Sequence, residues 1–332
     1  MNAPIRQAIP DAAPRRLSDW LLRWETILVL LLILVIIGNT AISPYFLDIY
    51  NLSDATYNFS EKAIVALPMA LLIITREIDL SVAAIMALAS LGTGLAAEAG
   101  APLWGLLLVG PVVGVLCGAF NGVLVTMVGL PSIVVTIGTM SLYRGLAQVV
   151  LGDQVIKGYP KDYTAIGQNY LVSWPPLPYS FVIFLVLAVV FGIVLHKTAF
   201  GRKLYAIGNN PMASRFSGIP VDRIRFLLFV ATGLLAGLAA TLLTARIGST
   251  RPNIALGWEL EIITMVILGG MSIAGGSGTI PGVVLAIFIL GLITFGLSLV
   301  NVPGIVISVI LGCLLIAAIA APILAHRLLG RR

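Results

Sequence analysis

Charged residues are scarce in this sequence. Only 10% of its 332 residues are Asp, Glu, Lys or Arg, whereas about a quarter of an ordinary soluble domain is charged. Apolar residues reach 59%, and the mean hydropathy is +1.06. No long polar region is left that could fold as a separate soluble domain. This composition excludes a nucleic-acid-binding protein, a secreted module and a conventional soluble enzyme, and it predicts a polytopic membrane protein.

Cysteine is also scarce. The two cysteines, Cys117 and Cys313, both lie within apolar runs, so the sequence predicts neither a disulfide framework nor a metal site. The phosphate-binding pattern Gly-x-x-x-x-Gly-Lys-Ser/Thr is absent from the sequence. We therefore expect no cofactor on this chain and no ATP bound through that motif.

Long uncharged runs take the place of charge. Residues 99–143 and 262–325 contain no Asp, Glu, Lys or Arg. One helix crosses a bilayer with about 20 apolar residues, so each run must hold more than one span. Spans of this length favour helices, because in lipid every backbone polar group must be paired within the segment. The sequence predicts an all-α protein with about ten transmembrane helices, or eight if some segments are re-entrant: 26–42, 63–75, 80–97, 103–119, 133–150, 179–195, 226–245, 262–274, 282–300 and 305–325.

The distribution of Lys and Arg predicts the orientation of these spans. Residues 1–25, 196–225 and 326–332 are rich in basic residues, and residues 196–225 contain a single acid, Asp222. Because basic connections stay in the cytoplasm, we expect both termini and this loop inside, around a transmembrane domain of residues 26–325. Residues 43–62 and 151–178 are then expected on the opposite side of the membrane.

Two of the apolar segments, 63–75 and 262–274, are short, and each runs into a break before a new apolar span begins. The first break, Thr75–Ser81, contains Arg76, Glu77 and Asp79, and the second contains Gly275-Gly276-Ser277-Gly278. Broken helices at matching places predict two similar halves, as in transporters built from repeats. The first break is either a charged elbow at the cytoplasmic end of a pathway or an ordinary turn in which Asp79 or Ser81 caps the next helix.

The basic loop 196–225 has the pattern of a short helix. Asn210-Pro211 is a helix start, and Gly218 and Pro220 are helix stops. Met212 and Phe216 lie four residues apart, so a helix would present them together as an apolar pair for a partner's groove. The alternative is a basic loop that lies on anionic lipid.

An ordered set of motifs runs along residues 26–325. The motifs are Ile-Asp-Leu-Ser at 78–81, Phe-Asn-Gly-Val-Leu-Val at 120–125, Ile-Gly-Thr-Met-Ser-Leu-Tyr-Arg-Gly at 137–145, Lys-Thr-Ala-Phe-Gly-Arg at 197–202, Gly-Asn-Asn at 208–210, Ser-Gly-Ile at 217–219, Leu-Gly-Gly at 268–270 and Gly-Gly-Ser-Gly-Thr at 275–279. This set resembles the permease subunits of sugar-importing ABC transporters of the ribose type. Among these permeases the sequence is most similar to the rhamnose and autoinducer-2 permeases, and it has Arg76-Glu77 where the commonest family pattern has a small pair.

The resemblance implies a subunit of the bacterial inner membrane that is not itself an enzyme. It implies a second permease chain, the same or paralogous, a cytoplasmic ATPase that binds and hydrolyses ATP, and a periplasmic sugar-binding protein. Residues 208–218 correspond to the helix on which the ATPase docks. The candidate residues of this coupling loop are Arg202, Gly208, Asn209, Asn210, Met212, Ala213, Phe216 and Gly218, and those of the cytoplasmic elbow are Arg76, Glu77, Asp79 and Ser81.

Two further classes compete with this interpretation. An ion-coupled sugar carrier would need ionisable residues in its spans, and a membrane-embedded enzyme would need a cluster of such groups, yet the central portions of the predicted spans contain none. A sugar pathway needs uncharged polar side chains, which could instead only hold helices together. The candidates for that pathway are Asn121, Thr136, Thr139, Ser141, Thr264 and Asn301.

Overall fold

The computed structural model describes residues 24–329, and of residues 318, 319 and 321–329 it describes the backbone alone. Most of the predicted N-terminal segment and the side chains of the predicted tail therefore lie outside the described residues. The helices are α2 (Trp24–Ile42), α3 (Ile49–Ile74), α4 (Val82–Glu98), α5 (Leu103–Thr126), α6 (Ser132–Leu151), α7 (Lys161–Gln168), α8 (Tyr179–Lys197), α9 (Ala199–Asn209), α10 (Pro211–Phe216), α11 (Val221–Ile247), α12 (Trp258–Leu268), α13 (Ile280–Leu299) and α14 (Gly304–Leu329).

Each of the ten predicted apolar segments corresponds to a separate helix. In the described part of the chain, α2, α3, α5, α6, α8, α11 and α13 are long and apolar enough to cross a membrane. The helix α4 and the stretch Gly304–Ala317 of α14 are shorter apolar helices, and α12 is shorter still. The all-α, multi-pass architecture with broken helices is thus confirmed.

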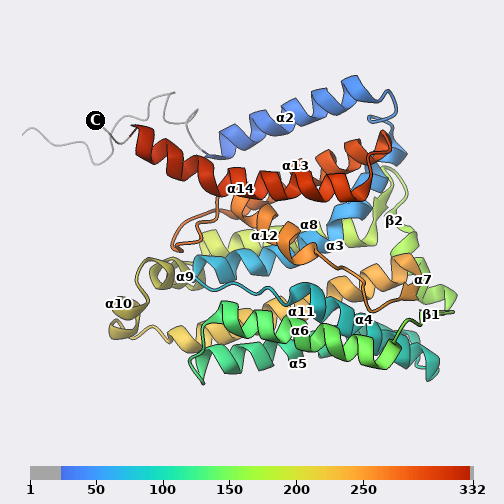
Figure 1. Ribbon diagram of the computed structural model, residues 1–332, viewed down its shortest axis with the longest axis horizontal. Coiled ribbons are helices and arrows are strands. Elements are labelled where there is room, and N and C mark those ends of the chain that lie inside the picture. The colour runs from blue at the N-terminus through green and yellow to red at the C-terminus, as the bar shows by residue number, and fades with distance from the viewer. Residues whose placement is uncertain (1–23, 330–332) are drawn as a thin grey trace, which may run out of the picture.

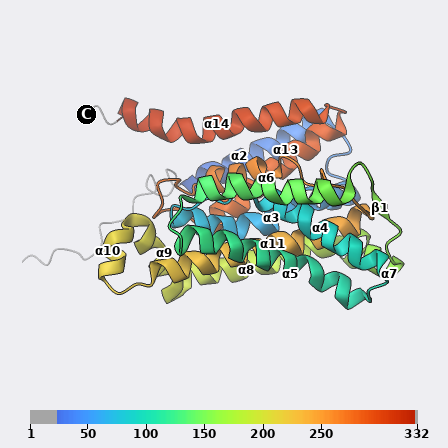
Figure 2. The same ribbon diagram turned by 60° about the horizontal axis from the view of Figure 1, so that its bottom comes forward.

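The long helices lie side by side, so the bundle has two distinct ends (Figure 1). One end, here called the α10 end, consists of α9, α10 and the two breaks, residues 75–81 and 269–279. The other, the α7 end, consists of α7 and four short strands. There β1 (Ile156–Lys157) pairs antiparallel with β4 (Ser249–Thr250), and β2 (Tyr170–Val172) pairs with β3 (Leu177–Pro178). Figure 2 shows the same two ends, with α14 along one side of the bundle.

Helix α3 is the centre of the bundle. Every residue from Phe59 to Thr75 is buried, and α3 packs against α8, α11, α12 and α13. The prediction that segment 63–75 is short was wrong, because α3 begins fourteen residues earlier, at Ile49. Asp48 caps it by accepting hydrogen bonds from the backbone N–H groups of Tyr50 and Asn51. Residues 49–62, expected in an outer connection, are therefore the first half of the central helix.

Glycine allows α5 and α11 to approach backbone to backbone. A Cβ atom on Gly114 would lie 2.1 Å from the carbonyl oxygen of Gly233, and one on Gly237 would lie 2.1 Å from that of Gly110. A third glycine of α5, Gly118, would place its Cβ 2.4 Å from the carbonyl oxygen of Phe229. Glycines four residues apart on one helix face are a common means of close packing in membranes, where no hydrophobic effect drives helices together.

Candidate functional site

The loop between α8 and α11 folds into two helices, α9 and α10. The predicted short helix is confirmed as α10: the side chain of Asn210 accepts a hydrogen bond from the N–H of Ala213 at 3.0 Å, and Pro211 opens the helix. After the helix, Gly218 has φ +79, a left-handed conformation that glycine adopts without strain. The local signals in the sequence thus account for both ends of α10.

The apolar pair of α10 faces away from the bundle. Met212 is 62% exposed and Phe216 is 86% exposed, whereas Ser214 on the opposite face is buried. Ala213, between them, is exposed, as are Arg202 on α9 and the capping residue Asn210. Two large apolar side chains at such exposure on a short polar helix have the geometry of a contact surface.

The first break follows α3 and is linked to this loop by Arg76. Arg76 Nε donates a hydrogen bond to the carbonyl oxygen of Gly208 at 2.6 Å, and its Nη2 donates to that of Asn209 at 2.8 Å. These carbonyls belong to the last turn of α9, where carbonyl oxygens have no N–H donor within the helix. The predicted elbow and coupling-loop residues Arg76, Gly208 and Asn209 therefore lie together.

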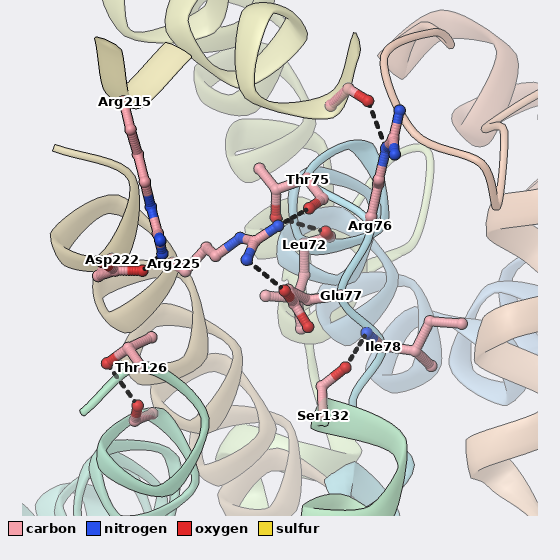
Figure 3. A network of polar contacts seen from close by, with 12 residues as sticks. Leu72, Thr75, Arg76, Glu77, Ile78, Thr126, Ser132, Arg215, Asp222 and Arg225 are labelled. Atoms are coloured by element: carbon pink, nitrogen blue, oxygen red, sulfur yellow. Dashed lines mark hydrogen bonds and ion pairs between the residues drawn. The ribbon is translucent and has the colours of Figure 1, made fainter. Parts of the chain in front are cut away.

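Glu77 links the same break to α11. It forms an ion pair with Arg225, at 2.9 Å, and Arg225 Nη2 also donates a hydrogen bond to the carbonyl oxygen of Thr75 at 2.9 Å (Figure 3). Both side chains of the pair are largely buried. A further ion pair, between Arg215 of α10 and Asp222 of α11, is about half exposed.

Asp79 and Ser81 belong to a buried polar cluster. Asp79 accepts hydrogen bonds from the backbone N–H of Ser81 at 2.8 Å and from its hydroxyl at 2.6 Å. Asn121 of α5 donates to the Ser81 hydroxyl at 2.8 Å, and the Tyr143 hydroxyl of α6 donates to Asn121 at 3.2 Å. Ser81 precedes α4, but its side chain makes no capping bond to that helix. The cluster fastens the first break to α5 and α6, which a simple helix cap would not do.

The second break, between α12 and α13, meets the first break and α9. Gly276 N–H donates a hydrogen bond to the carbonyl oxygen of Ile74, at the end of α3, at 2.9 Å. The hydroxyl of Tyr205 on α9 donates to the carbonyl oxygen of Gly278 at 2.7 Å. Burial raises the pKa of Tyr205, so this hydroxyl keeps its proton and remains a donor. Both breaks and the α9–α10 loop thus form one connected structure at the α10 end.

Charged residues are buried within the spans near the α7 end, contrary to expectation. Glu61, fully buried in α3, accepts a hydrogen bond from Arg246 of α11 at 2.8 Å, and Lys62 pairs with Glu261 of α12. Lys62 Nζ also lies 4.7 Å from the ring centroid of Trp258. Each of these charged residues lies next to an apolar segment in the sequence. Only their opposite signs could have indicated that they form pairs.

The six candidates for a sugar pathway do not come together. Asn121 belongs to the cluster with Asp79, and Asn301 lies in the turn after α13, with φ +57. Three threonine hydroxyls donate to carbonyl oxygens of their own helices: Thr136 to Ser132, Thr139 to Thr136 and Thr264 to Leu260. Ser141 is exposed on α6. The Ser141 hydroxyl also donates to its own helix, to the carbonyl oxygen of Ile137 at 3.3 Å. The role of the six residues in a sugar pathway stays a prediction.

Two open clefts lie at opposite ends of the bundle. The cleft at the α7 end, of about 460 Å³, is lined by polar residues that include Gln148, Asp153, Arg251 and Asn253. The cleft at the α10 end, of about 410 Å³, lies between the C-terminus of α5 and the start of α11 and is mostly apolar. Among the residues that the structure describes, no group of three or more His, Cys, Asp or Glu could hold a metal ion.

Comparison with known proteins gives a consistent result. Residues 51–319 match the model of a family described as the permease component of branched-chain amino acid transport systems. The chain is 34% identical to the autoinducer 2 import system permease protein LsrD of Klebsiella pneumoniae, over 90% of this chain and 91% of that protein. It is also 34% identical to LsrD of Enterobacter sp. strain 638, over 90% and 92%, and to LsrD of Escherichia coli K12, over 89% and 91%.

A solved structure shares the fold at low sequence identity. It is an inward-facing conformation of a metal-chelate type ABC transporter, with a TM-score of 0.50 and 16% identity, covering 91% of this chain and 97% of that one. At this identity the similarity concerns the fold alone, and it agrees with the arrangement of helices described above.

Proposed function

The chain belongs to the family of branched-chain amino acid transport system permease components, so it is a multi-pass permease subunit and not an enzyme, and we propose that it serves an ATP-driven importer of a monosaccharide or similar small polyol. The substrate class is that of rhamnose, ribose or autoinducer-2. The observation that carries this proposal is the similarity to autoinducer-2 permeases over about nine-tenths of both chains. The sequence motifs of ribose-type permeases support the same class.

In this proposal ATP is bound by a separate cytoplasmic ATPase that docks on α10. The exposed side chains of Met212 and Phe216 supply the apolar contact, and Asn210 and Gly218 shape the two ends of the helix. Arg202 and Ala213, also exposed, border this contact. Apolar side chains at the centre of a contact with a polar rim are typical of protein interfaces.

The α10 end is then cytoplasmic and the α7 end is periplasmic, in the inner membrane of a bacterium. The basic composition of residues 196–225 supports this orientation. A periplasmic sugar-binding protein delivers the substrate to the α7 end, where the polar cleft of about 460 Å³ is open. Both termini are on the cytoplasmic side.

A second permease chain, the same or paralogous, completes the pathway. The six polar candidates do not surround a shared cavity within one chain, so the pathway requires a second surface. Ser141 lies on the exposed face of α6, near Gly138 and Gly145, where an added Cβ would meet no atom within 4 Å. Small residues on a free helix face allow another helix to approach closely.

An ion-coupled carrier is the competing class, and the buried charges do not favour it. Glu61 and Arg246 neutralise one another, as do Lys62 and Glu261, so each carboxylate already has a fixed cationic partner. A coupling site needs a carboxylate that exchanges its cation during transport. Paired charges of this kind connect helices instead.

The proposal is tested by uptake in proteoliposomes. The chain is co-expressed with its ATPase, binding protein and second permease, and uptake of labelled rhamnose, ribose and autoinducer-2 is measured. We expect uptake that requires ATP inside and binding protein outside, and that continues in the presence of a proton uncoupler. Uptake by the purified chain alone, driven by a proton gradient, would contradict the proposal.

A further inference from the structure

Arg76 has a backbone conformation that residues with a side chain rarely adopt. Its φ is +69, in the left-handed region, and it directly follows the end of α3 at Thr75. Glycine makes such a turn without strain, because it has no Cβ atom. A long cationic side chain held in this conformation points to a role for the side chain itself.

The guanidinium of Arg76 donates hydrogen bonds at the junction between α9 and α10. Its two hydrogen bonds end on the carbonyl oxygens of Gly208 and Asn209, the last two residues of α9. Asn210, the next residue, caps the start of α10. A positive group at a helix C-terminus also interacts favourably with the helix dipole. Arg76 therefore binds the end of α9, directly before the exposed helix α10 begins.

The backbones at this junction are in close contact. A Cβ atom on Gly208 would lie 2.0 Å from the carbonyl oxygen of Ile74 and 2.3 Å from the nitrogen of Gly276. Gly276 itself donates a hydrogen bond to Ile74. The end of α3, the end of α9 and the second break thus meet without intervening side chains. Such a contact is stiff, because close-packed backbones transmit displacement and do not absorb it.

A side chain of α10 itself, Arg215, makes a weaker link to the spans. Arg215 of α10 pairs with Asp222 of α11, but both side chains are about half exposed, and exposed ion pairs contribute little. Arg76 is exposed as well, but it makes two hydrogen bonds to carbonyl oxygens, and its neighbours Thr75 and Glu77 both bind Arg225. The stronger route from α10 to the membrane therefore runs through Arg76.

We propose that Arg76 is a positioning residue that couples α10 to the α3–α4 break, so that displacement of α10 by the ATPase moves both helix breaks together. This inference rests on the proposed function, since it takes the ATPase as the partner of α10. It goes beyond that function by assigning the transmission to a particular side chain and two particular carbonyl oxygens. Arg76 contacts neither substrate nor ATP in this mechanism.

The test separates transmission from folding and from docking. Arg76→Gly removes the guanidinium and relieves the left-handed backbone, and Arg76→Asn removes it with a residue that tolerates this conformation. Lys203→Ala is the control, because Lys203 is an exposed cation on α9 with no partner in the described residues. Each variant is assembled with the complete transporter in proteoliposomes. The measurements are ATPase co-purification, basal ATP hydrolysis, stimulation of hydrolysis by sugar-loaded binding protein, and uptake.

For both Arg76 variants we expect normal ATPase co-purification and basal hydrolysis within about twofold of the unmodified protein. We expect stimulation and uptake to fall by about tenfold, which lies within the range for coupling between two sites. Lys203→Ala should behave like the unmodified protein. Unchanged stimulation and uptake in both Arg76 variants would overturn the inference, as would loss of ATPase co-purification or an equal effect in Lys203→Ala. If the unmodified chain captures no ATPase, the proposed function fails instead.

Discussion

At the scale of single residues, Phe216 combines high exposure with an apolar side chain. It is 86% exposed and lies on the same face of α10 as Met212. Because so little of its surface is buried, Phe216→Asp should change the stability of the isolated chain by less than about 0.5 kcal/mol. If α10 is the docking helix, the same change places a charge within an apolar contact.

We therefore expect Phe216→Asp to weaken ATPase binding by about 2 kcal/mol or more, the loss typical of a central aromatic residue in an interface. This loss is measured in detergent by co-purification of the ATPase with the chain over a series of ATPase concentrations. Leu171→Asp is the matched control, because Leu171 is 49% exposed on β2 at the opposite end. Equal ATPase binding by the unmodified chain and by Phe216→Asp would show that α10 only faces lipid or water.

Glu61 makes a second prediction at this scale, because it is fully buried beside Arg246. Removing one partner of a buried pair leaves an uncompensated charge, which costs about 3 kcal/mol or more. Arg246→Ala should therefore lower the unfolding temperature in detergent clearly. The neutral double change Glu61→Gln with Arg246→Gln should recover most of the loss. Arg251→Ala, at an exposed arginine of the same end, serves as control. A double variant as unstable as Arg246→Ala would contradict the pairing argument.

At the scale of helices, how much could be predicted depended on the range of the interactions. The ten apolar segments and α10 were predictable, since length, apolar content and the residues Asn210, Pro211 and Gly218 act locally. The start of α3 was not, because Glu61 and Lys62 are tolerated in the bundle only through Arg246 and Glu261, far away in the sequence. Two adjacent charged residues in a sequence are typical of a loop, so their place inside a helix bundle cannot be predicted until their partners are known.

The candidate site, too, could be predicted only in its local features. Elbow and coupling-loop residues were selected by motif, but their connection could not be predicted, because Arg76 and Gly208 are separated by 132 positions. For the pathway candidates, residue type gave no information on burial: Thr264 and Ser141 both donate to carbonyl oxygens of their own helices, but Thr264 is buried and Ser141 is exposed. Uncharged polar side chains have the same chemistry in either role.

The contact between α5 and α11 gives a prediction at the scale of helices. Gly114→Ala places a Cβ against the carbonyl oxygen of Gly233, and overpacking of this kind costs about 1–3 kcal/mol. Gly312→Ala on α14 should have no such cost, since a Cβ there meets no atom within 4 Å, and alanine favours the helix by about 1 kcal/mol. Thermal unfolding in detergent should thus shift in opposite directions. A shift of equal sign and size in both variants would contradict the close contact.

At the scale of the whole molecule, the proposed orientation rests on the distribution of the basic residues. The segment 196–225 forms the α10 end, and the segment 151–178 forms much of the α7 end, so one test of either segment orients the complete bundle. Because basic loops stay in the cytoplasm, we propose that the α10 end lies inside. The proposed docking of an ATPase on α10 requires the same orientation.

We expect single cysteines at the two ends to be labelled from opposite sides of the membrane. In a background with Cys117 and Cys313 replaced by alanine, Gln154→Cys reports on the α7 end and Met212→Cys on the α10 end; both positions are exposed. A membrane-impermeant maleimide applied to cells with a permeabilised outer membrane should label Gln154→Cys only, and in inside-out vesicles it should label Met212→Cys only. Labelling after full solubilisation controls for reactivity, since both cysteines must then react. The reverse pattern would place α10 in the periplasm, where no ATPase could reach it, and would overturn both the topology and the docking assignment.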